Sequence, residues 1–185
     1  MSSQSREAKI LIYLVVSMTI GAAVLMALDS QSISAGAFSL ASYSSLGSIS
    51  SVTETRQGTT ADRWDRIEVF YSNTKGGDLA QMASLSGLTS PDDLNFHFLV
   101  CNNLGELALD GQIQSTEKWL NQWSALPGVA WYGSSKTIRI CVIGEGKRTP
   151  ASDYQVSRTQ ELIDSLARKF DIKPSNISYP AAWQL

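Results

Sequence analysis

The feature that most constrains this chain is an uncharged, apolar run of nineteen residues near its amino terminus, Ile10–Leu28. At the rise of an α-helix this run spans about 28 Å, close to the bilayer's hydrocarbon core of about 30 Å. Arg6 and Lys9 precede the run, and the next basic residue after it is Arg56. The positive-inside rule therefore predicts a single-pass cell-membrane anchor, with residues 1–9 in the cytoplasm and the rest of the chain outside.

A cleavable export signal is the alternative to an anchor. A charged start followed by an apolar stretch also suits export, and Ser34–Ala37 offers small residues for a cleavage site. The anchor is favoured because the apolar run is longer than the usual core of such a signal and Ser34 lies well beyond its end. A buried core helix is a weaker reading, since the run has no polar face.

Residues 29–62 have the composition of a flexible tether. Ten of the 22 residues from Ser30 to Ser51 are serine. Such a segment buries too little apolar surface to offset the entropy lost on ordering. Scattered apolar residues leave open a short ordered or membrane-skimming piece: Phe38, Leu40, Tyr43, Leu46 and Ile49.

Residues 63–185 are expected to form one globular domain, because 185 residues leave room for a single ordinary core beside the anchor. The turn residues after Cys101 predict a hairpin that returns through Glu106–Leu109. The almost wholly apolar run Thr137–Ile143 is typical of an interior strand buried on both faces. Runs of β-forming residues predict strands at Ile67–Tyr71, Asn95–Cys101, Thr137–Ile143 and, briefly, from Ile177.

Helices are predicted at Asp78–Leu88, at Ser115–Trp123 and from Thr149 to Phe170. In the second of these, Trp119, Leu120 and Trp123 should form the apolar face. In the last, Thr149 is expected to cap the helix, with Pro150 at its first position, and Arg158 should lie on the polar face. Strands followed by a helix across them predict an α/β fold with a mixed central sheet flanked by helices.

Four stretches carry a resemblance to a known family. Ile67–Thr74 (IEVFYSNT) is similar to an I-x-V-H-x-S-x-T strand, and Phe96–Val100 (FHFLV) to a Y-H-F-x-I strand. Thr137–Gly144 (TIRICVIG) is similar to S-I-G-I-x-L-V-G, and Thr149–Ala151 opens a helix where T-P-x-Q is common. In this order the segments resemble the zinc N-acetylmuramoyl-L-alanine amidase (type 2) and peptidoglycan recognition protein family over roughly residues 64–180. The resemblance implies a mixed α/β fold and peptidoglycan as the substrate class.

The resemblance also implies a zinc site, but this chain replaces the residues that would form it. Phe70 stands at the family's first ligand position, and Tyr179 stands where the family has a histidine. No Cys, His, Asp or Glu follows Asp171 to supply a third ligand. Phe96 replaces a tyrosine implicated in the family's catalysis. A hydrolytic zinc needs three protein side chains with a lone pair, so no catalytic residue, metal ligand or cofactor is assigned.

His97 is the one matched position that keeps its identity, and it is the sole histidine of the chain. Its ordinary interpretation is a strand histidine that is satisfied by a hydrogen bond. Cys101 and Cys141 are interpreted as two buried thiols, although they could pair outside the cytoplasm. With 15 basic and 17 acidic residues and no block of like charge, the chain gives no electrostatic reason to expect nucleic acid as a partner.

The leading hypothesis is therefore a membrane-anchored, extracytoplasmic, non-catalytic relative of the amidases that binds peptidoglycan fragments (muropeptides) or an envelope protein. A working amidase with an unconventional zinc site is one alternative. An envelope scaffold that uses exposed Trp119 or Trp123 as contact residues is another. The side chains expected to line or fill the former metal site are Phe70, Tyr71, Phe96, His97, Trp131 and Tyr179.

Overall fold

The computed structural model describes residues 15–19, 46–56, 58–104, 108–126, 135–181 and 183. The chain divides into two compact units, Met1–Phe38 and Ser39–Leu185. In the first, Val15–Thr19 is helical and exposed. The rest of the predicted anchor at 10–28 lies outside the described residues, and within them no helix is both long and apolar enough to cross a bilayer.

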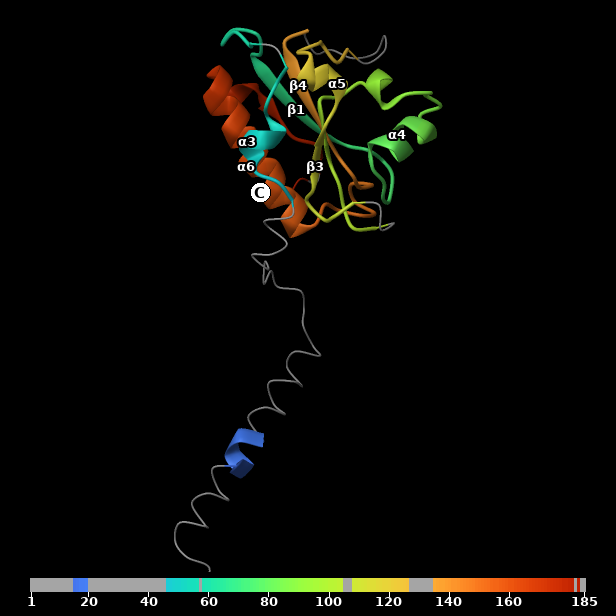
Figure 1. Ribbon diagram of the computed structural model, residues 1–185, viewed down its shortest axis with the longest axis vertical. Coiled ribbons are helices and arrows are strands. Elements are labelled where there is room, and N and C mark those ends of the chain that lie inside the picture. The colour runs from blue at the N-terminus through green and yellow to red at the C-terminus, as the bar shows by residue number, and fades with distance from the viewer. Residues whose placement is uncertain are drawn as a thin grey trace, which may run out of the picture. The chain divides into compact units, whose positions relative to one another are not determined.

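In the described part of the second unit, five strands form one sheet in the order β3-β2-β4-β1-β5 (Figure 1). The pairs β2–β4, β4–β1 and β1–β5 are parallel, whereas β3 is antiparallel to β2. Every residue of β4 is buried, which confirms the prediction of a central strand covered on both faces. The strands are β1 (Arg66–Tyr71), β2 (Phe98–Val100), β3 (Ile113–Ser115), β4 (Thr137–Val142) and β5 (Ile177–Ser178).

The hairpin after β2 forms, but Leu109, at the end of the predicted return through Glu106–Leu109, is not in a strand, and Glu106 and Leu107 lie outside the described residues. The strand that pairs with β2 is Ile113–Ser115. The reversal is made by Gly111, whose φ of 71° is a left-handed conformation that glycine adopts without steric cost. Its N–H donates to Cys101 O at 2.9 Å, so the turn closes immediately before β3.

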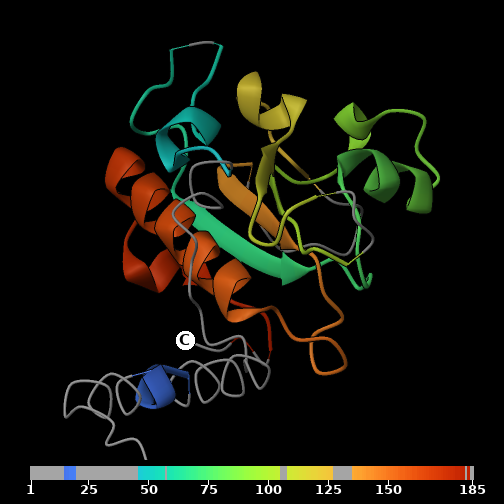
Figure 2. The same cartoon turned by 60° about the horizontal axis from the view of Figure 1, so that its bottom comes forward.

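Helices cover both faces of the sheet, as predicted (Figure 2). α6, α3 and α5 pack on one face, here called the α6 face, and α4 packs on the other, called the α4 face. Short 3-10 turns lie at Pro91–Asp93 and Pro174–Asn176. The helices are α3 (Ile49–Val52), α4 (Leu79–Leu85), α5 (Glu117–Leu120) and α6 (Asp153–Phe170).

α6 begins at Asp153, three residues later than Pro150, the first helical position expected from the sequence. The Ser152 hydroxyl accepts the Gln155 N–H, and the Gln155 side chain accepts the Ser152 N–H. This capping box satisfies two backbone donors and so defines the helix start. Arg158 was predicted to lie on the polar face but is 1% exposed. Its guanidinium donates to Gly47 O at 3.0 Å and pairs with Glu161, so partners from two elements make its burial tolerable.

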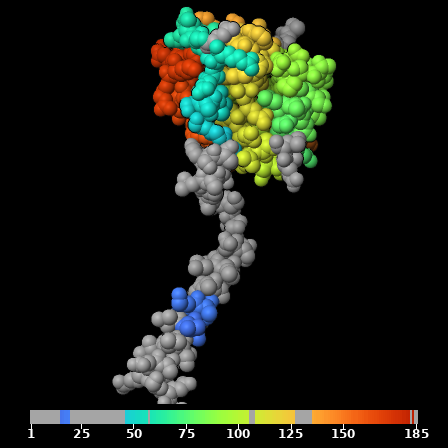
Figure 3. Space-filling model, in the orientation of Figure 1, coloured from blue at the N-terminus to red at the C-terminus, as the bar shows by residue number. Residues whose placement is uncertain are grey.

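The second half of the predicted tether belongs to the folded unit. We call residues Leu46–Arg56 the strap; they lie on the surface beside α6 (Figure 3). Leu46 is 5% exposed, and Lys169 donates to Thr53 O at 3.2 Å. The Arg56 N–H donates to Leu120 O at 3.0 Å, and its guanidinium pairs with Glu117. The folded unit therefore begins before the expected boundary at residue 63, while residues 29–45 lie outside the described part.

Candidate functional site

Phe70 and Phe96 lie together on the α4 face. Their ring centroids are 6.3 Å apart in an edge-to-face arrangement, and both pack with the buried residues beneath α4. The guanidinium of Arg139, from β4, lies 4.3 Å from the Phe70 ring centroid and donates through Nε to Glu68 at 2.7 Å. The position that the sequence analysis matched to a zinc ligand is thus a phenyl ring beside an ion pair, and neither the ring nor a protonated guanidinium has a lone pair to donate to a metal.

His97 is fully buried, and both of its ring nitrogens are hydrogen-bonded. Nδ1 accepts the Arg139 N–H at 2.9 Å, so the neutral ring carries its proton on Nε2, which donates to Trp123 O at 2.9 Å. Its ring contacts Trp64 edge-on at 4.8 Å between centroids. Burial lowers the pKa of His97 to about 3. The histidine therefore joins β4 to the loop at Trp123 and offers no unused lone pair to a metal.

Tyr71 and Tyr179 lie on the α6 face, joined by a third aromatic residue that the sequence analysis missed. Trp183 lies 6.0 Å from each tyrosine ring between centroids, and the Tyr179 hydroxyl donates to Gln160 of α6 at 3.3 Å. Burial raises the pKa of both phenols. The available signal for Trp183 was an aromatic residue in an otherwise small and polar terminal segment.

Six residues were expected to line or fill the former metal site, and the five that the structure describes do not converge. Phe70 and Phe96 share one face, Tyr71 and Tyr179 share the other, and His97 lies among core tryptophans. Trp131 lies outside the described residues. In the described ranges, no group of three or more His, Cys, Asp or Glu side chains is placed to hold a metal ion.

Trp123 is 56% exposed, although the sequence analysis placed it on the apolar face of a helix together with Trp119, which is fully buried. α5 ends at Leu120, and Gln122 adopts a left-handed φ of 55°, which turns Trp123 outward. The Trp123 backbone N–H donates to Lys118 O at 2.8 Å, and the Trp123 carbonyl oxygen accepts a hydrogen bond from His97 Nε2. The indole is therefore exposed from a backbone that is held in place, and Leu126, three residues further along the chain, is 53% exposed.

Cys101 and Cys141 are free and buried, as the sequence analysis predicted. Burial raises the pKa of Cys101 to about 12 and raises that of Cys141 as well. A thiol that stays protonated at neutral pH is a poor nucleophile and a poor metal ligand. Neither cysteine has the environment of a reactive residue.

Comparison with known proteins gives one structural likeness. No protein-family model and no curated protein matches the chain. The chain is similar to a solved structure described as the complex of the N-acetylmuramyl-L-alanine amidase AmiD from E. coli with the substrate anhydro-N-acetylmuramic acid-L-Ala-D-gamma-Glu-L-Lys. The sequence identity is 20% and the TM-score is 0.43, with 66% of this chain and 50% of that chain covered. The chain thus spans about half the length of the amidase chain to which it is similar.

Proposed function

We propose that this chain is a membrane-anchored, extracytoplasmic domain with an amidase-like framework that acts by binding and does not hydrolyse peptidoglycan. The observation that carries the proposal is the environment of Phe70. Its ring lies against Phe96, with the Arg139 guanidinium 4.3 Å from its centroid. At this position the amidase chemistry requires a side chain that donates a lone pair to zinc.

The other two candidate positions cannot compensate for Phe70. Tyr179 lies on the opposite face of the sheet, against Trp183 and Gln160. Both nitrogens of His97 are already hydrogen-bonded. A zinc ion that activates water needs three ligands converging on one point, and these residues provide no such point.

Metal content and turnover, measured together, test this part of the proposal. The full chain, purified from membranes and dialysed against zinc, should carry well under one zinc per chain. It should also release no peptide from a muropeptide. Stoichiometric zinc together with peptide release would establish an active amidase instead.

Membrane attachment is supported by the uncharged run at 10–28 and by the basic residues that precede it. The full chain should remain in the membrane pellet after alkaline carbonate washing, and a variant lacking residues 10–28 should be released. Protease added to intact spheroplasts should digest the folded unit if that unit lies outside. Protection from the protease would place the folded unit in the cytoplasm.

Between the two kinds of partner, an envelope protein is favoured by Trp123. Exposed tryptophans on a pre-ordered backbone are typical of the residues that dominate protein–protein contacts. Trp123 and Leu126 are both more than half exposed, whereas the rings at Phe70 and Phe96 are packed beneath α4. We therefore place the binding surface at Trp123 rather than at the position of the family's metal.

The variant Trp123→Ala tests this placement, with Leu85→Ala, an equally exposed apolar residue on α4, as the matched control. After cross-linking in membranes, Trp123→Ala should lose the principal cross-linked product, and Leu85→Ala should retain it. Direct titration with a muropeptide should show no binding to the parent chain. Muropeptide binding that is unaffected by Trp123→Ala would instead favour a peptidoglycan ligand at another site.

A further inference from the structure

The turn that exposes the Trp123 indole is attached to the core on both sides of that residue. Before it, the Gln122 side chain makes two hydrogen bonds: Oε1 accepts the Trp64 Nε1–H at 2.6 Å, and Nε2 donates to Trp119 O at 2.7 Å. After it, Ala125 is 2% exposed. Trp123 therefore points outward from between residues that are held inward.

The guanidinium of Arg63 bridges the two residues that flank Trp123. Nη2 donates to Gln122 O at 2.8 Å and to Ser124 Oγ at 3.1 Å, and Nε donates to Gln122 O at 3.2 Å. Nη1 donates to Ser135 O at 3.0 Å, and the Ser124 hydroxyl donates to the same carbonyl oxygen at 2.7 Å. One side chain thus joins three points of the chain, at positions 122, 124 and 135.

Arg63 is itself held in place by the core. Its guanidinium carbon lies 3.8 Å from the centroid of the Trp64 ring, which is 1% exposed. Burial lowers the pKa of Arg63, but an arginine stays protonated at neutral pH. The planar guanidinium presents its N–H donors at fixed angles, so it can serve several oxygens at once. A lysine ammonium, a compact group on a flexible stem, does not reproduce that geometry.

The backbone of Gln122 explains why the turn needs this support. Its φ of 55° is left-handed, a conformation that costs a residue other than glycine free energy and persists only where the surroundings fix it. Without the bonds to its carbonyl oxygen, the turn would be free to relax, and the indole of Trp123 would lose its fixed position. A side chain that is ordered before binding loses less entropy in the complex, so this order favours affinity.

We propose that Arg63 is the positioning residue of the Trp123 surface: its guanidinium holds Gln122 and Ser124 in the conformation that presents the indole to a partner. This inference rests on the proposed partner surface at Trp123. Arg63 acts through the turn rather than by contacting the partner. Replacing it should weaken partner binding by loosening Trp123, while the domain stays folded.

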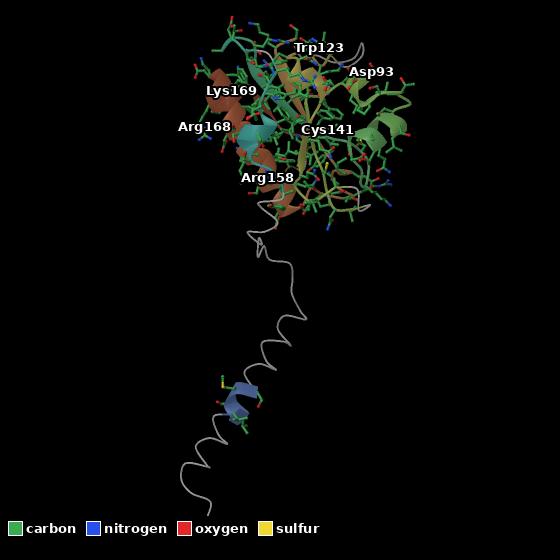
Figure 4. The ribbon with its side chains drawn as sticks, in the orientation of Figure 1. Asp93, Trp123, Cys141, Arg158, Arg168 and Lys169 are labelled. Atoms are coloured by element: carbon green, nitrogen blue, oxygen red, sulfur yellow. The ribbon has the colours of Figure 1, made fainter. Side chains whose placement is uncertain are left out.

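The variant Arg63→Lys tests the proposal in the full chain, with Arg158→Lys as the matched control. Both substitutions keep a positive charge and remove a guanidinium that makes several hydrogen bonds. Arg158 is 1% exposed and donates to Gly47 O and to Glu161, so its substitution should lower the urea midpoint at least as much. Figure 4 shows Arg158 and Trp123 toward opposite ends of the folded unit, so the control disturbs a different region.

Backbone amide hydrogen exchange, followed by mass spectrometry in detergent micelles, measures the order of the turn. The Trp123 N–H donates to Lys118 O at 2.8 Å, and this bond should open more often when the turn is loosened. Arg63→Lys should speed exchange in the peptide at 118–126 several-fold, and Arg158→Lys should leave it unchanged. Unchanged exchange in Arg63→Lys, or an equal rise in both variants, would overturn the proposal.

Cross-linking in membranes measures the consequence for the partner. The yield of the principal product, the one that Trp123→Ala should lose, should fall several-fold in Arg63→Lys and stay at the parent level in Arg158→Lys. If Arg63→Lys keeps the full yield while Trp123→Ala loses the product, Arg63 is not a positioning residue and the partner surface stands. If Trp123→Ala keeps the product, the partner surface is wrong and the positioning role falls with it, so the two failures are distinguishable.

Discussion

The two faces of the sheet differ in what their side chains do. The α6 face buries a large apolar set that includes Trp64, Trp119 and Phe98, with aromatic rings in mutual contact. The α4 face buries a smaller set and also carries the Arg139–Glu68 ion pair. The first face provides most of the core, and the second carries Phe70 and Phe96.

This difference explains why the proposed groove residues separate. Successive side chains of a strand point to opposite faces, so Phe70 and Tyr71 cannot belong to the same surface. The same alternation separates Tyr71, which packs with the α6-face core, from Phe70, which packs beneath α4. A list of candidates taken from neighbouring positions therefore describes two separate surfaces.

Truncating a buried side chain of the α6-face core should lower the free energy of unfolding more than any other change considered below. Trp119→Ala should lower the free energy of unfolding by about 3–5 kcal/mol, because Trp119 is fully buried and contacts Phe98 and Phe170. Phe70→Ala, at a half-buried position on the other face, should lower it by only about 1–2 kcal/mol. Urea unfolding of both variants measures the difference, and equal losses would remove the proposed distinction between the faces.

The next largest effect is the dependence of stability on pH that the buried side chain of His97 should cause. Because burial lowers its folded pKa to about 3, the folded state stays neutral below pH 6.5 while the unfolded state gains a proton. Stability should therefore fall by up to about 1.4 kcal/mol per pH unit as the pH drops from 6.5 toward 5. His97→Gln, which offers one donor and one acceptor, should be less stable at pH 7 but show a flatter profile over this range. A parent profile as flat as that of the variant would argue against a neutral buried ring.

An effect of about the same size is expected in the strap. Leu46→Ala should lower the free energy of unfolding by about 2 kcal/mol, because this leucine is 5% exposed and belongs to the folded unit rather than to a tether. Ser50→Ala, at an exposed position of α3, should change it by less than about 0.5 kcal/mol. If the two variants are equally stable in urea, the strap contributes nothing to the fold.

The sequence predicted the central strand and the mixed sheet because apolar runs such as Thr137–Ile143 depend little on distant contacts. The buried thiols at Cys101 and Cys141 were also predicted correctly. The sequence left open a short ordered piece that includes Leu46 and Ile49, but it did not predict that this strap packs against a buried Arg158. The hydrogen bond from Arg158 to Gly47 O joins residues more than a hundred positions apart. Neither the serine-rich composition of the strap nor the charge of Arg158 indicates that the two are partners. Long-range hydrogen bonds of this kind leave no local pattern in the sequence.

The candidate site was harder to predict than the fold, for a related reason. The outward turn of Trp123 follows from a left-handed Gln122, a conformation that glutamine's own preferences do not indicate. The grouping of Tyr71 with Tyr179 and Trp183 follows from a short parallel pairing between β1 and β5. Both features are decided by tertiary contacts.

Introducing a single histidine at position 70 should produce a still smaller change. Phe70→His places an imidazole beside the Arg139 guanidinium and away from Tyr179, so zinc affinity should not rise above that of the parent chain. The double variant with Tyr179→His should behave in the same way, because the two positions lie on opposite faces. Isothermal titration with zinc measures this. Binding at micromolar or lower concentrations in the double variant would show that the two positions can converge after all.

The smallest expected effect is that of oxidation. Leu99 is paired with Cys141, so Cys101 lies two residues further along its strand. With strands about 4.8 Å apart and a rise of about 3.3 Å per residue, the two cysteine Cα atoms should be about 8 Å apart. A disulfide needs a separation below about 7 Å, so the bond cannot form without moving a central strand. Treatment with a mild oxidant should therefore leave two titratable thiols in the unfolded chain and an unchanged urea midpoint, even for a protein outside the cytoplasm. Loss of both thiols would mean that β2 and β4 can slide past each other. The centre of the sheet would then be less rigid than the pairing of these two strands implies.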